Sequence, residues 1–254
     1  MMAALITGRG SVDMVCMDDP APGPRDVVVA VAACGLCPTD RMLLGGDLAP
    51  ELPLVPGHEF AGEVVAVGRD VTEPTVGDRV AVDPVLNCGT CRSCRRGGRG
   101  RRCERVGVIG VTAPGGAAEF AVVPAANCVL LPEHVSAYDA TLIEPLSRAL
   151  RAYRALRRRP PGKGAPAHGE GAVGLMVREL ARNANSLGLT EPMQPSGISD
   201  GDAFVRAVEL FSRGVLDPDD FIGDRLPLSS CAEALRNLPT GGCRKIQVQP
   251  AITL

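Results

Sequence analysis

Four cysteines lie close together near the middle of the 254-residue chain, in the pattern Cys88-x2-Cys91-x2-Cys94-x8-Cys103. Four thiolates in such a short segment can surround one tetrahedral Zn²⁺ ion, and a closed set of four protein ligands is typical of a structural site. The alternative, four unrelated buried thiols, does not account for the regular spacing. The cluster therefore predicts a metal that stabilises a segment with little hydrophobic core of its own.

Arginines and glycines surround the four cysteines. The arginines favour a solvated rim that offsets the negative charge of a zinc ion held by four thiolates, and contact with phosphates is the less favoured alternative. These residues are Arg92, Arg95, Arg96, Arg99, Arg101, Arg102 and Arg105, with Gly97, Gly98 and Gly100.

A second set of possible metal ligands is dispersed along the chain. One soft thiolate, one imidazole and one or two carboxylates are the right types for a zinc site that keeps an open coordination position. A cysteine and a histidine so far apart are weak evidence alone, since a solitary histidine beside a glycine is more often an ordinary structural residue. The members are Cys37, Thr39-Asp40, Gly57-His58-Glu59 and Glu144-Pro145.

The elements that must position these residues differ between the two halves of the chain. Short β-branched runs closed by Gly, Pro, Asn or Asp predict a compact barrel-like fold in the first part. After Pro145 the apolar spacing becomes helical. We expect strands at 27–32, 60–67, 79–82, 118–123, 127–131, 221–228 and 245–248, and helices at 146–159, 172–183, 203–213 and 230–238, with Ser229 or Ser230 as a cap for the last.

Three motifs carry a family resemblance. They resemble those of the zinc-containing alcohol dehydrogenases, the medium-chain dehydrogenase/reductase family. Glu144-Pro145-Leu146 resembles a segment of the polyol and threonine dehydrogenase branch of that family. The four-cysteine segment lies where that family keeps its structural zinc, and the resemblance covers residues 1–160. The motifs are Gly57-His58-Glu59-x-x-Gly62-x5-Gly68-x-x-Val71, Cys34-Gly35-Leu36-Cys37-Pro38-Thr39-Asp40 and Glu144-Pro145-Leu146.

The resemblance implies two zinc ions and a role for each dispersed residue. Cys37 and His58 would hold the catalytic zinc, Glu59 would be a nearby or exchanging ligand, and Glu144 would complete the set. Asp40 would orient the His58 ring, as a carboxylate commonly does for a metal-bound imidazole. Thr39 would contact the substrate oxygen and pass its proton outward.

Two details depart from the family pattern. The gap from Cys94 to Cys103 is one residue longer than usual, which the glycines in it can absorb. The family often places a histidine two residues after this aspartate, at the end of a proton relay, and this chain has Met42 there. Because a thioether cannot carry a proton, that route must differ or be lost.

The segment that should bind a dinucleotide is short. Gly169-x-Gly171-x-x-Gly174 resembles the family's phosphate-binding turn, and Glu191 would be the acid that grips the ribose. However, Pro166 interrupts the strand expected before the turn, and residues 160–254 are too few for a complete sheet, which needs well over ~100 residues. These features argue against tight NAD(P) binding.

The resemblance therefore implies an α/β (α+β overall) chain in three parts. We expect a GroES-like β-barrel catalytic domain with a structural zinc lobe at 1–147, a truncated Rossmann-like remnant at 148–202, and a segment at 203–254 that returns to the catalytic domain. Since most of the sheet through which family members pair is absent, a homo-oligomer would use a non-standard interface.

Composition limits the other partners. The net charge of −2, with two Tyr, five Phe and no Trp, gives no case for nucleic-acid or membrane binding. No signal peptide or membrane-length apolar run is visible, so we expect a cytoplasmic protein whose cysteines are thiols or metal ligands.

Three functions remain open at this point. The first is a zinc-dependent oxidoreductase acting on a small alcohol, polyol or ketone. The second is a cofactor-independent zinc lyase or hydratase that dehydrates, eliminates or cleaves a hydroxylated small molecule. The third is a non-catalytic, zinc-stapled remnant.

Overall fold

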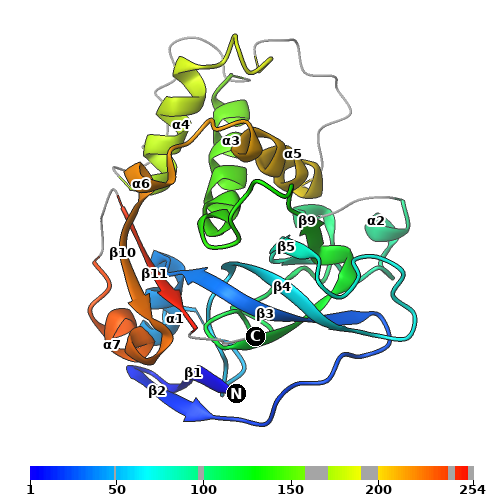
Figure 1. The fold of residues 1–254 in the computed structure, drawn as a ribbon, viewed down its shortest axis with the longest axis vertical. Coiled ribbons are helices and arrows are strands. Elements are labelled where there is room, and N and C mark those ends of the chain that lie inside the picture. The colour runs from blue at the N-terminus through cyan, green and yellow to red at the C-terminus, as the bar shows by residue number, and fades with distance from the viewer. Residues whose placement is uncertain (49, 97–99, 158–170, 190–199, 240–243, 251–254) are drawn as a thin grey trace.

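The computed structural model describes the chain except for residues 49, 97–99, 158–170, 190–199, 240–243 and 251–254. In the view of Figure 1, a layer of helices lies above a strand-rich half that contains the N-terminus. No helix in the described part of the chain is long and apolar enough to cross a membrane.

A seven-stranded sheet forms the centre of the strand-rich half. Its order is β10-β11-β3-β4-β5-β9, and β8 also pairs with β3. Alternate residues of the long strand β3, such as Val27, Val29 and Val31, are buried in one hydrophobic core. The strands are β3 (Asp26–Gly35), β4 (Glu59–Val67), β5 (Arg79–Val82), β8 (Phe120–Pro124), β9 (Cys128–Leu130), β10 (Ile222–Pro227) and β11 (Lys245–Gln249).

The predicted strands all correspond to strands of this sheet, with small differences at their ends. The strand predicted to begin at Ala118 begins at Phe120, because Ala118 forms only an isolated bridge to Ala3. The sequence prediction missed the hairpin of β1 (Met2–Gly8) and β2 (Ser11–Cys16), and the short pair β6 (Val85–Leu86) and β7 (Gly107–Val108).

The helical layer consists of α3 (Ile143–Arg157), α4 (Ala172–Arg182) and α5 (Asp200–Ser212). Helix α3 begins three residues before the predicted start, because a proline is tolerated in the first turn of a helix. Both α4 and α5 pack on α3 (Figure 1). They form a second core with fully buried members such as Met176, Leu180 and Leu210. The apolar side of 175–181 is therefore covered within the chain.

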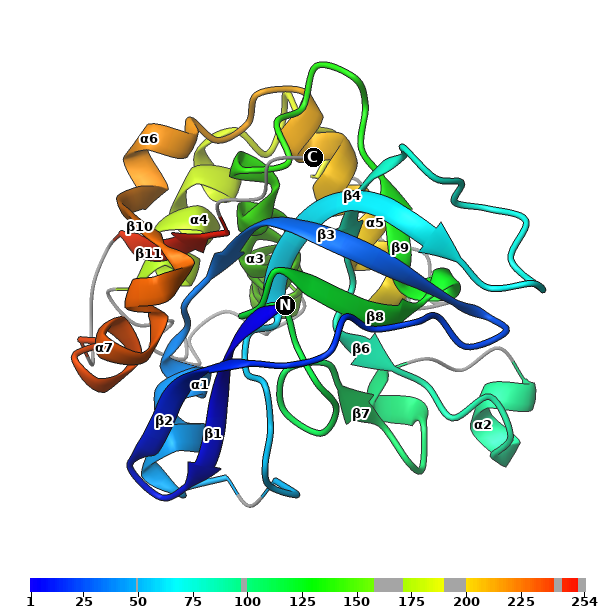
Figure 2. The ribbon, with the colours of Figure 1, turned by 60° about the horizontal axis from the view of Figure 1, so that its bottom comes forward.

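The described residues between 143 and 221 contain helices and turns and no strand. The chain then returns to the sheet through α6 (Pro218–Phe221), β10 and the short helix α7 (Cys231–Arg236). Helix α7 lies beside α1 (Pro38–Gly45) and β2, as Figure 2 shows. The cap predicted for this helix is wrong in one respect: Ser230 precedes it, but its hydroxyl makes no capping hydrogen bond, because a 3₁₀ turn at Leu228–Ser230 leads directly into the helix.

Candidate metal centres and active site

Cys37 lies between β3 and helix α1. It is buried, and its backbone N–H donates a hydrogen bond of 2.8 Å to Oδ2 of Asp40. Pro38 takes the first helical position, where its missing N–H costs nothing. The sequence prediction missed α1, although Pro38 and the acidic Asp40 in the first turn are the usual signals of a helix start.

His58 follows a glycine that no other residue can easily replace. Gly57 has a φ of +97°, and a Cβ there would lie 2.6 Å from Sγ of Cys34 and 2.9 Å from the backbone nitrogen of Ala117. The Gly57 N–H donates to Oδ1 of Asp40 over 3.2 Å. Asp40 therefore fixes the backbone on which His58 is carried as well as that of Cys37.

The side chains of Cys37, His58 and Glu59 converge. One potential ligand atom of each lies within 4.8 Å of the others, and all three residues are buried. The two ring nitrogens of His58 and Oε2 of Glu144 are buried and have no hydrogen-bond partner in the described part of the chain. Buried polar atoms without partners are rare in folded proteins and point to a missing ion or water. A thiolate, an imidazole and carboxylates fit Zn²⁺.

Charge around His58 also favours a cation. Burial lowers the pKa of His58, but the nearby carboxylate of Asp40 and thiol of Cys37 more than offset this effect and leave the pKa raised. Nδ1 of His58 lies 3.5 Å from Oδ1 of Asp40, and Nε2 lies 4.0 Å from Oε1 of Glu59. The predicted pairing of Asp40 with the His58 ring is thus present as a close contact.

Lys245 is a member of this site that the sequence prediction missed. Its Nζ donates to both carboxylate oxygens of Glu59, each over 2.5 Å, and both side chains are buried. Burial lowers the pKa of Lys245, but the negative charge of Glu59 more than offsets this effect and leaves the pKa raised. The amine therefore stays protonated. Gly35 makes room for this pair, since a Cβ there would lie 2.7 Å from Oε2 of Glu59. Only a basic residue at the start of the last predicted strand hinted at this contact.

Glu144 lies in the first turn of α3 and is buried. It is outside the group of three converging ligands, but within electrostatic reach of Glu59 and His58. Burial raises the pKa of Glu144, and the negative charge of Glu59 raises it further. An ion at the cluster would relieve both effects.

Thr39 and Met42 lie on the first turns of α1. Sγ of Cys37 is 3.7 Å from the hydroxyl of Thr39, which is half-buried and so borders both the cluster and solvent. Met42 is 43% exposed, which leaves nothing polar at the position where a relay histidine was expected.

The four cysteines of the zinc lobe also converge. Their sulfur atoms all lie within 4.8 Å of one another, and those of Cys88 and Cys94 are 3.9 Å apart. Backbone N–H groups point at the sulfurs, for example from Cys94 to Cys91 over 3.3 Å. Hydrogen bonds from the backbone of Thr90 and Cys91 lower the pKa of Cys88 to about 5, whereas burial raises that of Cys94 to about 12. This donor set fits a tetrahedral metal ion.

The arginines predicted at the rim of this lobe are solvent-exposed where the structure describes their side chains. Arg105 donates to the hydroxyl of Thr90 over 2.5 Å. The exposed ones are Arg92, Arg95, Arg96, Arg102 and Arg105, and the side chains of Arg99 and Arg101 lie outside the described residues.

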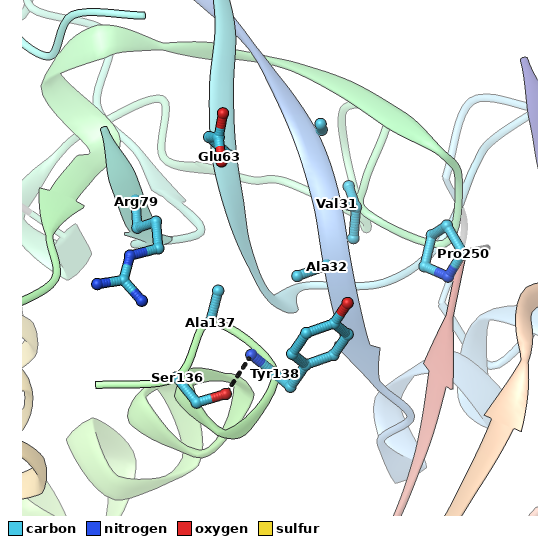
Figure 3. A pocket seen from close by; sticks show the side chains of 9 residues that line it. Val31, Ala32, Glu63, Arg79, Ser136, Ala137, Tyr138 and Pro250 are labelled. Atoms are coloured by element: carbon cyan, nitrogen blue, oxygen red, sulfur yellow. Dashed lines mark hydrogen bonds between the residues drawn. The ribbon is translucent and has the colours of Figure 1, made fainter. Parts of the chain in front are cut away.

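A cleft of about 310 Å³ lies between the sheet and the segment that carries Ser136, Ala137 and Tyr138 (Figure 3). The Arg79 guanidinium at this cleft donates to the backbone carbonyls of Val135 and Glu133. The lining includes none of the candidate metal ligands, so this cleft is separate from the candidate active site. It is formed by Ala30, Val31, Ala32, Glu63, Arg79, Ser136, Ala137, Tyr138 and Pro250.

The predicted dinucleotide-binding residues are only partly described. Gly171 is the N-cap residue of α4, which therefore has no capping side chain. Gly174 is buried in that helix. Gly169 and Glu191 lie outside the described residues.

Comparison with known proteins agrees with this architecture. Residues 23–133 match the alcohol dehydrogenase GroES-like domain. The chain is 40% identical over 174 residues to the L-threonine 3-dehydrogenase of Saccharopolyspora erythraea. This match covers 67% of this chain and 50% of that protein. Residues 23–133 belong to the GroES-like domain family of the alcohol dehydrogenases. The predicted family is thereby confirmed.

A second curated relative shows a similar extent of match. The chain is 35% identical over 190 residues to the starvation-sensing protein RspB of Escherichia coli K12, covering 72% of this chain and 53% of that protein. The chain thus spans about half the length of the curated relatives that it matches.

Solved structures of this family share the fold. An alcohol dehydrogenase from Thermus sp. ATN1 is similar with a TM-score of 0.79 at 22% identity, over 98% of this chain and 100% of that one. The RspB alcohol dehydrogenase of Escherichia coli CFT073, solved with NADH, gives a TM-score of 0.76 at 24% identity, over 98% and 99%. The mixed α/β fold class is therefore confirmed.

Proposed function

We propose that this chain is a zinc-dependent oxidoreductase that acts on a small alcohol or polyol, or on the corresponding ketone. The observation that carries the proposal is the convergence of Cys37, His58 and Glu59. The two ring nitrogens of His58 have no hydrogen-bond partner among the described residues. The curated relatives named L-threonine 3-dehydrogenase support the same reaction class.

In this proposal Cys37 and His58 hold the catalytic zinc, with Glu144 and Glu59 as the carboxylates available to complete the set. When bound, zinc would lower the pKa of a hydroxyl group or polarise a carbonyl. Asp40 holds the backbone of Cys37 and Gly57 and orients the His58 ring.

The protein's own proton route begins at Thr39. Its hydroxyl borders the cluster and solvent, so it can accept the proton of a substrate hydroxyl and release one outward. Because Met42 cannot continue a relay, the route we propose ends at Thr39 and water.

The proposed division of the chain is the three parts 1–147, 148–202 and 203–254, with the middle part a shortened dinucleotide-binding domain. The turn at 169–174 would hold the cofactor pyrophosphate at the start of α4. The pairing of β11 with Cys34 and Gly35 of β3 supports a C-terminal part that rejoins the barrel.

Metal analysis and cofactor titration test this proposal together. We expect two zinc ions per chain, quenching or enhancement of NADH fluorescence on binding, and NAD(P)-linked oxidation of a small alcohol such as L-threonine. Loss of the second zinc in Cys37→Ser with unchanged activity would refute it. So would the absence of a second zinc in the wild-type chain.

One observation favours a second candidate, a cofactor-independent zinc lyase or hydratase. Helices α4 and α5 pack on α3, and the described residues between 143 and 221 include no strand of a dinucleotide-binding sheet. Two bound zinc ions, no response to NADH and turnover of a hydroxylated substrate without NAD(P) would favour this candidate over the oxidoreductase.

A further inference from the structure

Arg148 is a charged residue near the catalytic cluster that the proposed chemistry does not use. It lies on α3 four residues after Glu144, and residues at that spacing lie on one face of a helix, with Cβ atoms about 5–6 Å apart. Glu144 is buried, whereas Arg148 is exposed. Position 148 therefore lies where the helix face that carries Glu144 meets solvent.

Among the residues that the structure describes, none is a counter-ion in contact with the Arg148 guanidinium. It makes no hydrogen bond or ion pair with any residue that the structure describes, although it lies within electrostatic reach of Glu144, Cys37 and Glu59. The negative charge of Glu144 raises the pKa of Arg148, and partial burial opposes this rise. A guanidinium with five free N–H donors in a planar fork suits bidentate recognition of an anion.

The acidic groups of the site are already committed to other partners. Lys245 donates to both oxygens of Glu59. The two oxygens of Asp40 accept the backbone N–H groups of Cys37 and Gly57. A divalent cation at the cluster would neutralise Cys37 and Glu144. With zinc in place, the positive charge of Arg148 would thus be left without a partner in the described part of the chain.

We infer that Arg148 binds an anionic group of the substrate, a carboxylate or a phosphate, and so restricts the site to small hydroxylated anions. This inference rests on the proposed function, because it concerns the molecule that would meet the zinc. The substrate hydroxyl would face the metal cluster and Thr39, and its anionic end would face the outer part of α3. A neutral alcohol of the same shape would lack this second contact.

Calorimetric titration of the zinc-loaded full chain tests the inference with matched probes. L-lactate and (S)-propane-1,2-diol share a carbon skeleton and differ in the anionic group, and glycerol 3-phosphate against glycerol gives the corresponding phosphate pair. We expect each anion to bind at least tenfold more tightly than its neutral partner. The tighter of the two anions identifies the group that the site prefers.

Variants at position 148 then locate the contact. Arg148→Met should weaken binding of the preferred anion at least tenfold and leave the neutral partner within twofold, and Arg148→Lys should restore part of the loss. Arg178→Met is the matched control, since Arg178 is an exposed arginine on α4 that forms no hydrogen bond or ion pair with the described residues. It should bind the anion as the wild type does.

The outcomes separate this inference from the proposed function. Equal binding of anion and neutral partner, or unchanged anion binding in Arg148→Met, overturns the role of Arg148 even if the chain oxidises neutral alcohols. Anion binding that depends on Arg148, in a chain without NAD(P)-linked activity, supports the role and refutes the oxidoreductase. Variants that unfold are recognised by circular dichroism, and the lysine variant and the wild-type probe pairs then decide the result.

Discussion

The two candidate metal-binding clusters differ in the length of chain that builds them. The four cysteines of the lobe all lie between residues 88 and 103, with the short helix α2 (Arg92–Arg95) between them. The proposed catalytic cluster joins Cys37, His58 and Glu59, and Lys245 from the last strand forms an ion pair with Glu59. The four-cysteine cluster is local in sequence, whereas the second cluster is brought together by β3, β4 and β11.

Their surroundings differ in the same way. Cys88 and Cys94 are only half-buried, and the side chains around them reach solvent. The members of the proposed catalytic cluster are buried. The buried carboxylate of Asp40 accepts the backbone N–H groups of Cys37 and Gly57, and the buried amine of Lys245 donates to Glu59. The lobe can therefore be organised by its metal, whereas the catalytic cluster is organised by the fold before any metal binds.

Removing the catalytic thiolate should have the largest effect. In Cys37→Ser we expect zinc to fall from two ions per chain to one and turnover to fall about a thousandfold, equivalent to about 4 kcal/mol of transition-state stabilisation. Elemental analysis and steady-state kinetics measure both. Cys16→Ser, at an exposed cysteine, should match the wild type. Retention of both zinc ions would show that Cys37 is no ligand.

Removing a thiolate of the four-cysteine lobe should affect stability more than turnover. Cys91→Ser should also lose one zinc ion, but the loss should appear as about 3 kcal/mol of stability, or roughly 6–12 °C in Tm, with turnover reduced less than tenfold. Differential scanning calorimetry and zinc analysis test this. If turnover falls as far as in Cys37→Ser, the two clusters are not independent.

Removing the counter-charge should have an intermediate effect. Lys245→Met leaves the buried carboxylate of Glu59 without its partner, and residues that support metal ligands commonly change metal affinity or activity by about 10–100-fold. We expect a loss of that size in zinc affinity, measured by competition with a chelator. Lys245→Arg should retain most of the affinity, and an equal loss in both variants would argue against a charge effect.

The smallest effect should come from the rim of the lobe. Thr90→Val removes the exposed hydrogen bond from Arg105 and the contact with Sγ of Cys88. An exposed contact of this kind contributes about 0.5 kcal/mol, so Tm should fall by only about 1–2 °C. A loss as large as that in Cys91→Ser would mean that Thr90 is essential to the metal site.

The sequence predicted the local features better than the distant ones. The spacing of Cys88, Cys91, Cys94 and Cys103 was sufficient to predict their convergence, because ligands a few residues apart are brought together by any compact loop. The β-branched runs also predicted the strands of the sheet. The β1–β2 hairpin was missed because its strands are partly built from alanine and methionine, which have no strong strand preference.

The dispersed site was predicted only as far as the family resemblance reached. The roles of Cys37, His58 and Asp40 were inferred from motifs, and the structure brings these residues together. Lys245 could not be inferred, because its partner Glu59 is distant in sequence and meets it only through the pairing of β11 with β3. Arg148 has no motif and is understood only from its position beside Glu144.

The order of synthesis gives the ion pair between Glu59 and Lys245 one more consequence. A chain emerging from the ribosome would complete β3 and β4 long before β11. The carboxylate of Glu59 would therefore have no ion pair with Lys245 during most of translation. The pocket around His58 would thus mature only when the last strand docks. A nascent chain halted before that strand should keep the barrel core accessible to water.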